Sequence, residues 1–290
     1  MRKDYILENF TSLSVIQNKR QISELYNHFG VVIFPKLLSE DFFFRGYVND
    51  LSRIFDEVLS RHTNDGKPRD LGDKLALLNS LSPLDGKILT DLGTQPNKFN
   101  SFNLIKYSVW LNDLLLELFG NEAIMVTPQA GDTLHFFAPG EAFRRYNLPP
   151  HQDYQYLMQS PKQITCYLGL SDYKADVGGL AFWEGSHKLG VLKSHKNNFG
   201  SYEISDYENI LCDFELSEFF WNPGDFAIFD SLLVHSSIQN FSVENGRVVQ
   251  IFRFSDANND TSRKINYRST CYERRGVKFE DVHPNLFELK

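Results

Sequence analysis

The second half of the chain is divided into short apolar segments, and this division limits the folds that it can adopt. After residue 120 these segments are separated by Gly, Pro, Asn and Asp, and they read AIMV, TLHFFA, QITCYLGL, GLAFW, DFAIFD and RVVQIFRF. Segments of about four to eight residues bounded by turn residues are typical of β-strands and short for helices. We therefore expect a mainly β fold, an all-β sandwich or barrel, from about residue 121 onward.

The first 120 residues have helical periodicity instead. NKRQISELYNHFG (18–30) has apolar residues at helical spacing and ends at a glycine, and VVIF (31–34) predicts one strand. Further helices are expected from an N-cap at Ser39 and over about 102–119. We expect one domain over 1–290, with a mostly helical part (1–120), a strand-rich core (121–260) and a C-terminal extension (261–290).

Composition excludes several classes of protein. The formal net charge of −7 lacks the basic field of a nucleic-acid or anionic-membrane binder. No apolar run approaches the roughly 20 residues of a membrane span, and MRKDYILENF is too polar for a secretory signal. Three cysteines without a C-x-x-C motif fit a reducing compartment. We expect a cytoplasmic protein, monomeric or homodimeric, whose partner is a small-molecule substrate.

The segment PPHQDYQYL (149–157) contains a histidine and an aspartate two residues apart. In an extended chain His151 and Asp153 would point the same way, because strands repeat every two residues. An imidazole and a carboxylate directed at one point are two of the three ligands of a non-heme iron facial triad. Taken alone, the motif also fits two polar residues at the end of a loop.

A third ligand would come from elsewhere in the chain. The sequence has eight histidines, and His235 follows the turn and apolar strand of NPGDFAIFDSLLVH, which would place it at the mouth of a barrel. His135 lies within TLHFFA and can face either way. The remaining histidines lie in loops, turn-like segments or near helix ends: His28, His62, His187, His195 and His283.

The strand GRVVQIFRF (246–254) contains two arginines on one face. Alternation places Arg247 and Arg253 together with Val249 and Ile251, and Val248 opposite. A buried guanidinium is costly unless it meets an anion, and it can bind a carboxylate through two parallel hydrogen bonds. The sequence therefore offers two imidazoles, one carboxylate and an arginine that can bind an anion (the clamp). This set of groups suits Fe(II) and a dicarboxylic keto acid. Arg253 is the alternative to Arg247 as the clamp.

In combination these segments resemble the phytanoyl-CoA dioxygenase (PhyH-like) family of Fe(II)/2-oxoglutarate-dependent oxygenases. The matching pieces are PPHQDYQY, ITCYLGLSD, GGLAFWEGSHKLG and NPGDFAIFDSLLVHSSIQNFSVENGR, in the family's order. The opening FGVVIFPKLLSEDF is similar to the family's N-terminal element, so the resemblance extends over most of the chain.

The resemblance implies a double-stranded β-helix (jelly roll, cupin-like) from about residue 121 onward, with the N-terminal helices packed on one sheet. It also implies roles for individual residues. His151, Asp153 and His235 would be the iron ligands, and Arg247 would bind the distal carboxylate of 2-oxoglutarate. Ser237 would assist Arg247. Tyr167, at a position where the family often has tryptophan, would pack against the cosubstrate. His187 would be a structural hydrogen-bonding residue, and Tyr156 would lie on the substrate side. Arg144 and Arg145 would be either partners of an anionic substrate group or solvated loop charges.

The implied activity is that of a dioxygenase that uses Fe(II), 2-oxoglutarate and O2. It would hydroxylate an unactivated C–H bond of a small polar metabolite and release succinate and CO2. Asp153 favours oxygenation, because related halogenases have a small residue in place of this carboxylate. Two alternatives remain at this point: a non-catalytic jelly-roll binding protein, and a jelly-roll metal enzyme that does not use 2-oxoglutarate.

Overall fold

The structure is a computed structural model that describes residues 3–63, 70–81, 98–120, 123–127, 132–137, 147–174, 176–198, 200–242, 244–264 and 278–287. Its strands are β1 (Val31–Phe34), β2 (Met125–Val126), β3 (Thr133–Phe137), β4 (Gln163–Gly169), β5 (Leu180–Trp183), β6 (Ser194–Lys196), β7 (Tyr202–Ile204), β8 (Leu216–Phe219), β9 (Phe226–Asp230), β10 (His235–Ser237) and β11 (Arg247–Asp256). The helices are α1 (Ser12–Gln17), α2 (Lys19–Phe29), α3 (Phe42–Leu59), α4 (Leu71–Leu81), α6 (Asn100–Lys106), α7 (Val109–Phe119), α8 (Tyr207–Ile210), α9 (Asp260–Lys264) and α10 (Phe279–Val282), with 3-10 turns η3 (Asp153–Gln155), η4 (Ser186–Leu189) and η6 (Pro284–Leu286).

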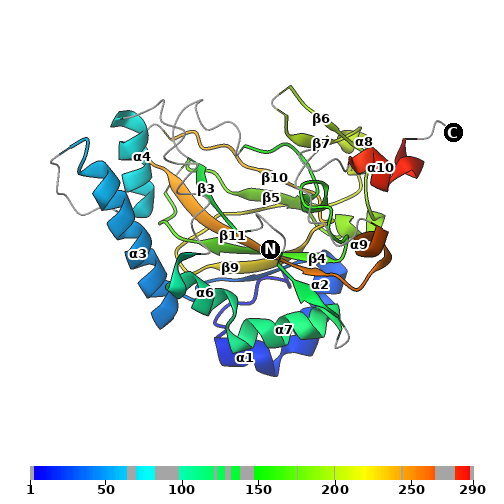
Figure 1. The fold of residues 1–290 in the computed structure, drawn as a ribbon, viewed down its shortest axis with the longest axis horizontal. Helices are drawn as coiled ribbons and strands as arrows, with labels where there is room; N and C mark the ends of the chain where they lie inside the picture. Colours follow the sequence, from blue (N-terminus) through cyan, green and yellow to red (C-terminus); the bar gives the residue numbers. More distant parts are fainter. Residues whose placement is uncertain are drawn as a thin grey trace.

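The described strands form a larger and a smaller sheet, with a separate two-stranded ribbon (Figure 1). The larger sheet has the order β1-β9-β4-β11-β2, and β3 also pairs with β11. The smaller sheet has the order β10-β5-β8, and β6 pairs with β7. These strand pairings are antiparallel, and the chain has the jelly-roll fold that the family resemblance implies.

The two faces of the larger sheet belong to different hydrophobic clusters. In β11, Val249 and Ile251 pack between the two sheets with Tyr167 of β4. Val248 and Phe252 face the other way, into the core shared with the N-terminal helices. This is the predicted alternation, and it places Arg247 and Arg253 on the face between the sheets.

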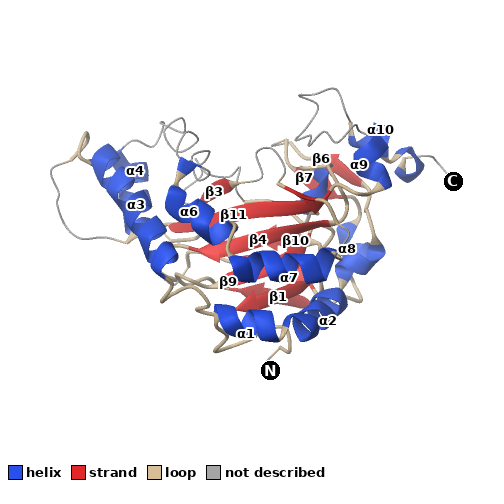
Figure 2. Cartoon of the chain, turned by 60° about the horizontal axis from the view of Figure 1, so that its bottom comes forward, coloured by secondary structure: helices blue, strands red, loops and turns tan. Residues whose placement is uncertain are grey.

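The N-terminal helices cover the outer face of the larger sheet, as Figure 2 shows for α1, α2, α6 and α7. Trp110 of α7 packs edge-to-face on Phe226 of β9, with ring centroids 5.3 Å apart. Tyr47 of α3 donates a hydrogen bond of 2.6 Å to Gln250 of β11. The helical half of the sequence therefore provides the apolar layer that buries the outer side of the sheet.

Local caps explain where the helices begin and end. α2 ends at Gly30, which has a φ of 79° and donates its backbone N–H to Tyr26. The predicted N-cap at Ser39 is two residues early: the Asp41 carboxylate accepts the N–H of Phe44, whereas the Ser39 hydroxyl donates to the Lys36 carbonyl.

The predicted helix over 102–119 is two helices, because the backbone turns extended at Ser108 between α6 and α7. The sequence also failed to predict α4 and the short strands β6, β7, β8 and β10. In the described part of the chain, no helix combines the length and the apolar composition that crossing a membrane requires.

Candidate active site

Two histidines meet through a backbone bridge at the mouth between the sheets. His151 and His235 each donate a backbone N–H to the other's carbonyl, at 3.0 and 3.1 Å. Their rings are 4.2 Å apart between centroids. The Asp230 carboxylate accepts the N–H of Leu232 in the turn that leads from β9 of the larger sheet to β10 of the smaller sheet.

Asp153 completes a buried cluster with these histidines. Gln152 is extended, so the side chains of His151 and Asp153 reach the same side before the chain turns into η3. Asp153 Oδ1 lies 3.8 Å from His151 Nε2 and 3.9 Å from His235 Nε2. The three residues are buried, and one ligand atom from each lies within 4.8 Å of the others.

Hydrogen bonds to the backbone fix the orientation of both imidazoles. His151 Nδ1 lies 2.7 Å from the Pro149 carbonyl, and His235 Nδ1 lies 2.9 Å from the Leu233 carbonyl. A carbonyl accepts only, so each Nδ1 carries the proton and each Nε2 keeps its lone pair. His151 Nε2 is buried without a hydrogen-bond partner among the described residues.

Burial keeps the two imidazoles neutral. It lowers the pKa of His151 to about 3, with the neighbouring His235 adding to the effect. Burial also lowers the pKa of His235 from its ordinary value. Neutral imidazoles offer a lone pair to a metal without first losing a proton.

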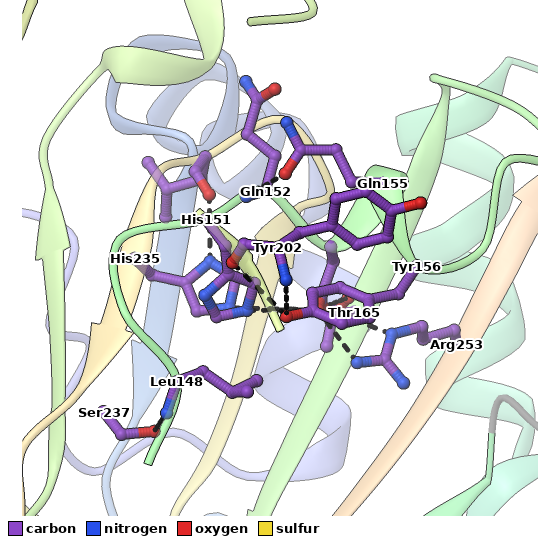
Figure 3. A network of polar contacts seen from close by, with 12 residues as sticks. Leu148, His151, Gln152, Gln155, Tyr156, Thr165, Tyr202, His235, Ser237 and Arg253 are labelled. Atoms are coloured by element: carbon purple, nitrogen blue, oxygen red, sulfur yellow. Dashed lines mark hydrogen bonds and ion pairs between the residues drawn. The ribbon is translucent and has the colours of Figure 1, made fainter. Parts of the chain in front are cut away.

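Asp153 is ionised and held by two side chains of the larger sheet, Thr165 and Arg253. Figure 3 labels these two side chains. Thr165 of β4 donates its hydroxyl to Oδ2 at 2.6 Å, and Arg253 of β11 donates to Oδ2 and Oδ1 at 3.2 and 3.0 Å. Burial acts to raise the pKa of Asp153, but Arg253 and the two histidines outweigh it, so this pKa lies below its usual range.

Arg247 is a buried cation without a counter-ion in the described structure. It is 1% exposed, and none of its three guanidinium nitrogens has a hydrogen-bond partner among the described residues. The guanidinium lies 3.8 Å above the ring centroid of Phe137. Burial lowers the pKa of Arg247, and the nearby Tyr167 counteracts this. Such a cation is costly to leave unsatisfied, which indicates a place for an anion.

A cavity connects the cluster with the surroundings of Arg247. Tyr167 and Phe137, both neighbours of Arg247, line it together with the three residues of the cluster, Ser237 and Arg253. The Tyr167 ring stacks on Trp221 with centroids 4.3 Å apart. Ser237 accepts the backbone N–H of Leu148 through its hydroxyl. His135 of β3 also lines the cavity, which settles which way it faces.

Other predicted residues lie around this cavity or outside it. The ring of Tyr156 meets that of His151 edge-to-face at 5.4 Å, and its hydroxyl accepts the N–H of Tyr202. His187 bonds the carbonyl of Asn27, remote from the cluster. Arg144 and Arg145 lie outside the described residues.

Sequence reasoning missed the environment of Asp153. It offered Arg253 as the alternative clamp for the cosubstrate, whereas Arg253 forms an ion pair with Asp153 of the cluster. Thr165 was not considered, although it alternates with Tyr167 on β4 and is the cross-strand neighbour of Arg253. The missing information was the register between β4 and β11, which neither strand encodes alone.

The sequence profile of the phytanoyl-CoA dioxygenase (PhyH) family matches residues 93–248, which is more than half of the chain. The matched range contains His151, Asp153, His235 and Arg247. Comparison with curated proteins finds no match.

Several solved structures share the fold at low sequence identity. The epimerase SnoN, in complex with Fe3+, alpha ketoglutarate and nogalamycin RO, has a TM-score of 0.56 and 14% identity, over 83% of this chain and 84% of SnoN. EctD from S. alaskensis with bound Fe has a TM-score of 0.51 and 14% identity, over 83% and 77% of the two chains. ThoJ, a non-heme monooxygenase, has a TM-score of 0.50 and 16% identity, over 81% and 77%.

The structural likenesses show the fold, and the match of the family profile over more than half the chain shows the family. The buried group of two imidazoles and one carboxylate has the donor set of a facial triad for iron. The chain belongs to the phytanoyl-CoA dioxygenase family, and it is an oxygenase that depends on iron and 2-oxoglutarate.

Proposed function

We propose that this oxygenase hydroxylates an unactivated C–H bond of a small polar metabolite, with iron held by His151, Asp153 and His235. The observation that carries the proposal is the convergence of three buried ligand atoms in a cavity next to Arg247, which is buried and has no hydrogen-bond partner among the described residues. The cluster suits a divalent cation and Arg247 suits a carboxylate, and both lie between the two sheets.

The donor set fits a divalent first-row metal. Both Nε2 atoms have their lone pairs available, because each Nδ1 proton is donated to a backbone carbonyl. The buried Nε2 of His151, which lacks a hydrogen-bond partner among the described residues, would gain one in the metal. Two imidazoles and one carboxylate on one side leave the opposite side for cosubstrate and O2.

Arg247 would bind the distal carboxylate of 2-oxoglutarate. A guanidinium and a carboxylate form two parallel charge-assisted hydrogen bonds, which would satisfy nitrogens that now have no described partner. Phe137 and Tyr167 hold the guanidinium in a dry environment, which strengthens its attraction for an anion. Tyr167 would pack along the cosubstrate, and Ser237, which lines the same cavity, would assist its binding.

Bound iron, with 2-oxoglutarate and O2, supplies the oxidising chemistry: the keto acid loses CO2 to give succinate, and one oxygen atom enters the substrate. The protein's residues bind, orient and shield the reactants. His151 is held in place by Tyr156 on one side and by the Pro149 carbonyl on the other. His135 and Tyr156, which carry polar atoms near the cluster, would contact a polar substrate.

The first test is succinate formation from 2-oxoglutarate with Fe(II), O2 and ascorbate, across a panel of small polar metabolites. We expect a metabolite that raises succinate formation and leaves as an alcohol with one added oxygen atom. Asp153→Gly should abolish this activity, because it removes the anionic ligand. Binding of 2-oxoglutarate without succinate would favour the non-catalytic alternative, and turnover of a metabolite independent of 2-oxoglutarate would favour the other metal enzyme.

The cysteines bear on the compartment in which the enzyme works. We propose that it works on a free small molecule in the cytoplasm. The described cysteines support a reducing compartment, since Cys166 is buried in the core and Cys212 is exposed, and both are unpaired. Activity that follows the soluble fraction of lysed cells, with no thiol oxidation in the purified protein, is the expected result.

A further inference from the structure

We infer that Arg253 and Thr165 are positioning residues that act through Asp153 and select which of its two oxygens faces the metal. The inference rests on the proposed function, since it concerns the carboxylate proposed as an iron ligand. It also gives a role to the arginine that the sequence offered as a rival cosubstrate clamp.

The hydrogen bonds to Asp153 use its lone pairs unequally. A carboxylate has about four lone-pair sites, two on each oxygen. Oδ2 accepts one bond from Thr165 Oγ1 at 2.6 Å and one from Arg253 Nε at 3.2 Å, so both of its sites are used. Oδ1 accepts one bond, from Arg253 Nη2 at 3.0 Å. One lone pair remains, and it belongs to the oxygen nearest the two imidazoles.

This arrangement makes Asp153 a one-oxygen ligand. A carboxylate that bound through both oxygens would take two coordination positions, whereas a facial triad needs three positions open for cosubstrate and O2. Oδ2 could join the metal only by giving up a bond to Thr165 or Arg253. By holding Oδ2, Thr165 and Arg253 would keep it from occupying a coordination position that the cosubstrate or O2 needs.

The larger sheet places Thr165 and Arg253 next to each other. Thr165 of β4 and Arg253 of β11 are opposite each other in the register of the larger sheet, so their side chains leave the same face. Both are buried. His151 and His235, in contrast, are bridged at the smaller sheet. The carboxylate is thus held by one sheet and the imidazoles by the other. Figure 3 shows Thr165 and Arg253 on one side and His151 and His235 on the other.

Substitutions of Thr165 and of Arg253, each with a matched control, distinguish the orientation of the Asp153 carboxylate from the effect of a nearby charge. Thr165→Val removes a hydroxyl while keeping shape and charge, and Thr165→Ser is its matched control because it keeps the hydroxyl. Arg253→Gln removes the charge and the paired donors, and Arg253→Lys restores the charge without the paired geometry. The probe is Co(II) added to the metal-free protein without O2, because its visible absorption reports both affinity and coordination number.

We expect Thr165→Val and Arg253→Gln to weaken Co(II) binding by about 10–100-fold, as other changes around metal ligands do, and to alter the absorption spectrum. Thr165→Ser should behave as the wild type, and Arg253→Lys should recover part of the affinity but not the spectrum. A purely structural salt bridge would change the unfolding midpoint and leave the Co(II) spectrum of the folded protein unaltered.

Wild-type affinity and spectrum in Thr165→Val and Arg253→Gln would overturn the inference while leaving the triad intact. If Arg253→Gln does not fold, Thr165→Val decides, since it is neutral and isosteric. Failure of the wild type to bind Co(II), or unchanged binding in Asp153→Gly, would instead overturn the proposed function, and this inference with it.

Discussion

Arg247 combines nearly complete burial with a guanidinium that has no hydrogen-bond partner among the described residues. Burial removes this cation from water, and the described residues do not replace its hydrogen bonds, which costs stability. The carboxylate of 2-oxoglutarate, which we propose as its ligand, would supply the missing anion. Arg253, on the same strand, differs because it forms an ion pair with Asp153.

Replacing Arg247 with Met should therefore raise stability and impair cosubstrate binding at once. We expect a higher unfolding midpoint without 2-oxoglutarate, and an apparent 2-oxoglutarate requirement raised by roughly 10–100-fold because a bidentate contact is lost. Metal affinity should stay close to that of the wild type. Thermal unfolding with and without 2-oxoglutarate, and succinate formation against its concentration, measure both effects.

Arg247→Lys is the matched control, since it keeps the charge but offers a single point of contact. It should recover part of the 2-oxoglutarate affinity. The assignment would be contradicted if Arg253→Lys, and not Arg247→Lys, showed the selective loss of 2-oxoglutarate affinity with normal metal binding.

Asp230, at the end of β9, provides a pH-dependent test. Burial raises its pKa to about 6, although Leu232 N–H and the Tyr26 hydroxyl both donate to it. Between its ordinary value of 3.8 and about 6, the folded state holds a proton that the unfolded state has released. This contribution to stability is therefore present below pH 4 and is lost as pH rises to about 6.

We predict that the free energy of unfolding of the wild type, relative to that of Asp230→Asn, falls by about 2 kcal/mol from pH 4 to pH 7. The amide does not titrate, so the difference between the two proteins isolates this carboxyl. Urea unfolding at several pH values is the measurement. A difference that rises with pH would mean that the folded protein favours the charged carboxylate.

At the scale of elements, the start of β11 is set by its contact with α4. The Gly246 N–H donates to the Gly72 carbonyl at 3.2 Å, next to Arg247. A Cβ on Gly72 would lie 2.3 Å from the carbonyl oxygen of Gly246, which no folded protein tolerates without movement. The two backbones approach this closely because neither residue has a side chain.

Gly72→Ala should consequently destabilise the protein by about 1–3 kcal/mol through overpacking. It should also weaken 2-oxoglutarate binding, by displacing the strand end that carries Arg247. Gly46→Ala in the middle of α3 is the control: the nearest atom lies at 3.8 Å, and alanine should stabilise that helix by up to about 1 kcal/mol. Equal effects of the two substitutions would contradict the close approach.

The strands were predictable where they are long and regular. β4, β9 and β11 are apolar runs bounded by turn residues, and their alternation correctly assigned the faces of β11. β10 was not recognised, because His235–Ser237 is polar and becomes a strand only through pairing with β5. The H-x-D spacing indicated two residues of the cluster, but no local pattern records that Thr165 and Arg253 are cross-strand neighbours.

For the whole molecule, the helical and β parts share one apolar cluster. Leu111 and Leu114 of α7 belong to the same core as Ile164 and Val248 of the larger sheet. The sheet also takes its edge strand β1 from the N-terminal part, so neither part has a complete core of its own. This organisation favours cooperative unfolding.

The three tryptophans allow this cooperativity to be measured. Trp110 lies in α7, whereas Trp183 and Trp221 lie in the β part. Fluorescence from Trp110 alone (Trp183→Phe and Trp221→Phe) and from Trp221 alone (Trp110→Phe and Trp183→Phe) should report transitions that coincide with circular dichroism in each protein. Separate transitions within one protein would mean that the helical layer unfolds independently of the sheets.

The central claim is that one cavity holds a metal on His151, Asp153 and His235 and a keto acid on Arg247. Anomalous diffraction from crystals grown with Fe(II) and 2-oxoglutarate, without O2, tests it most directly. We predict one iron peak in contact with both Nε2 atoms and Oδ1 of Asp153, and a carboxylate of 2-oxoglutarate paired with Arg247. An iron peak elsewhere, or 2-oxoglutarate bound away from Arg247, would contradict the account.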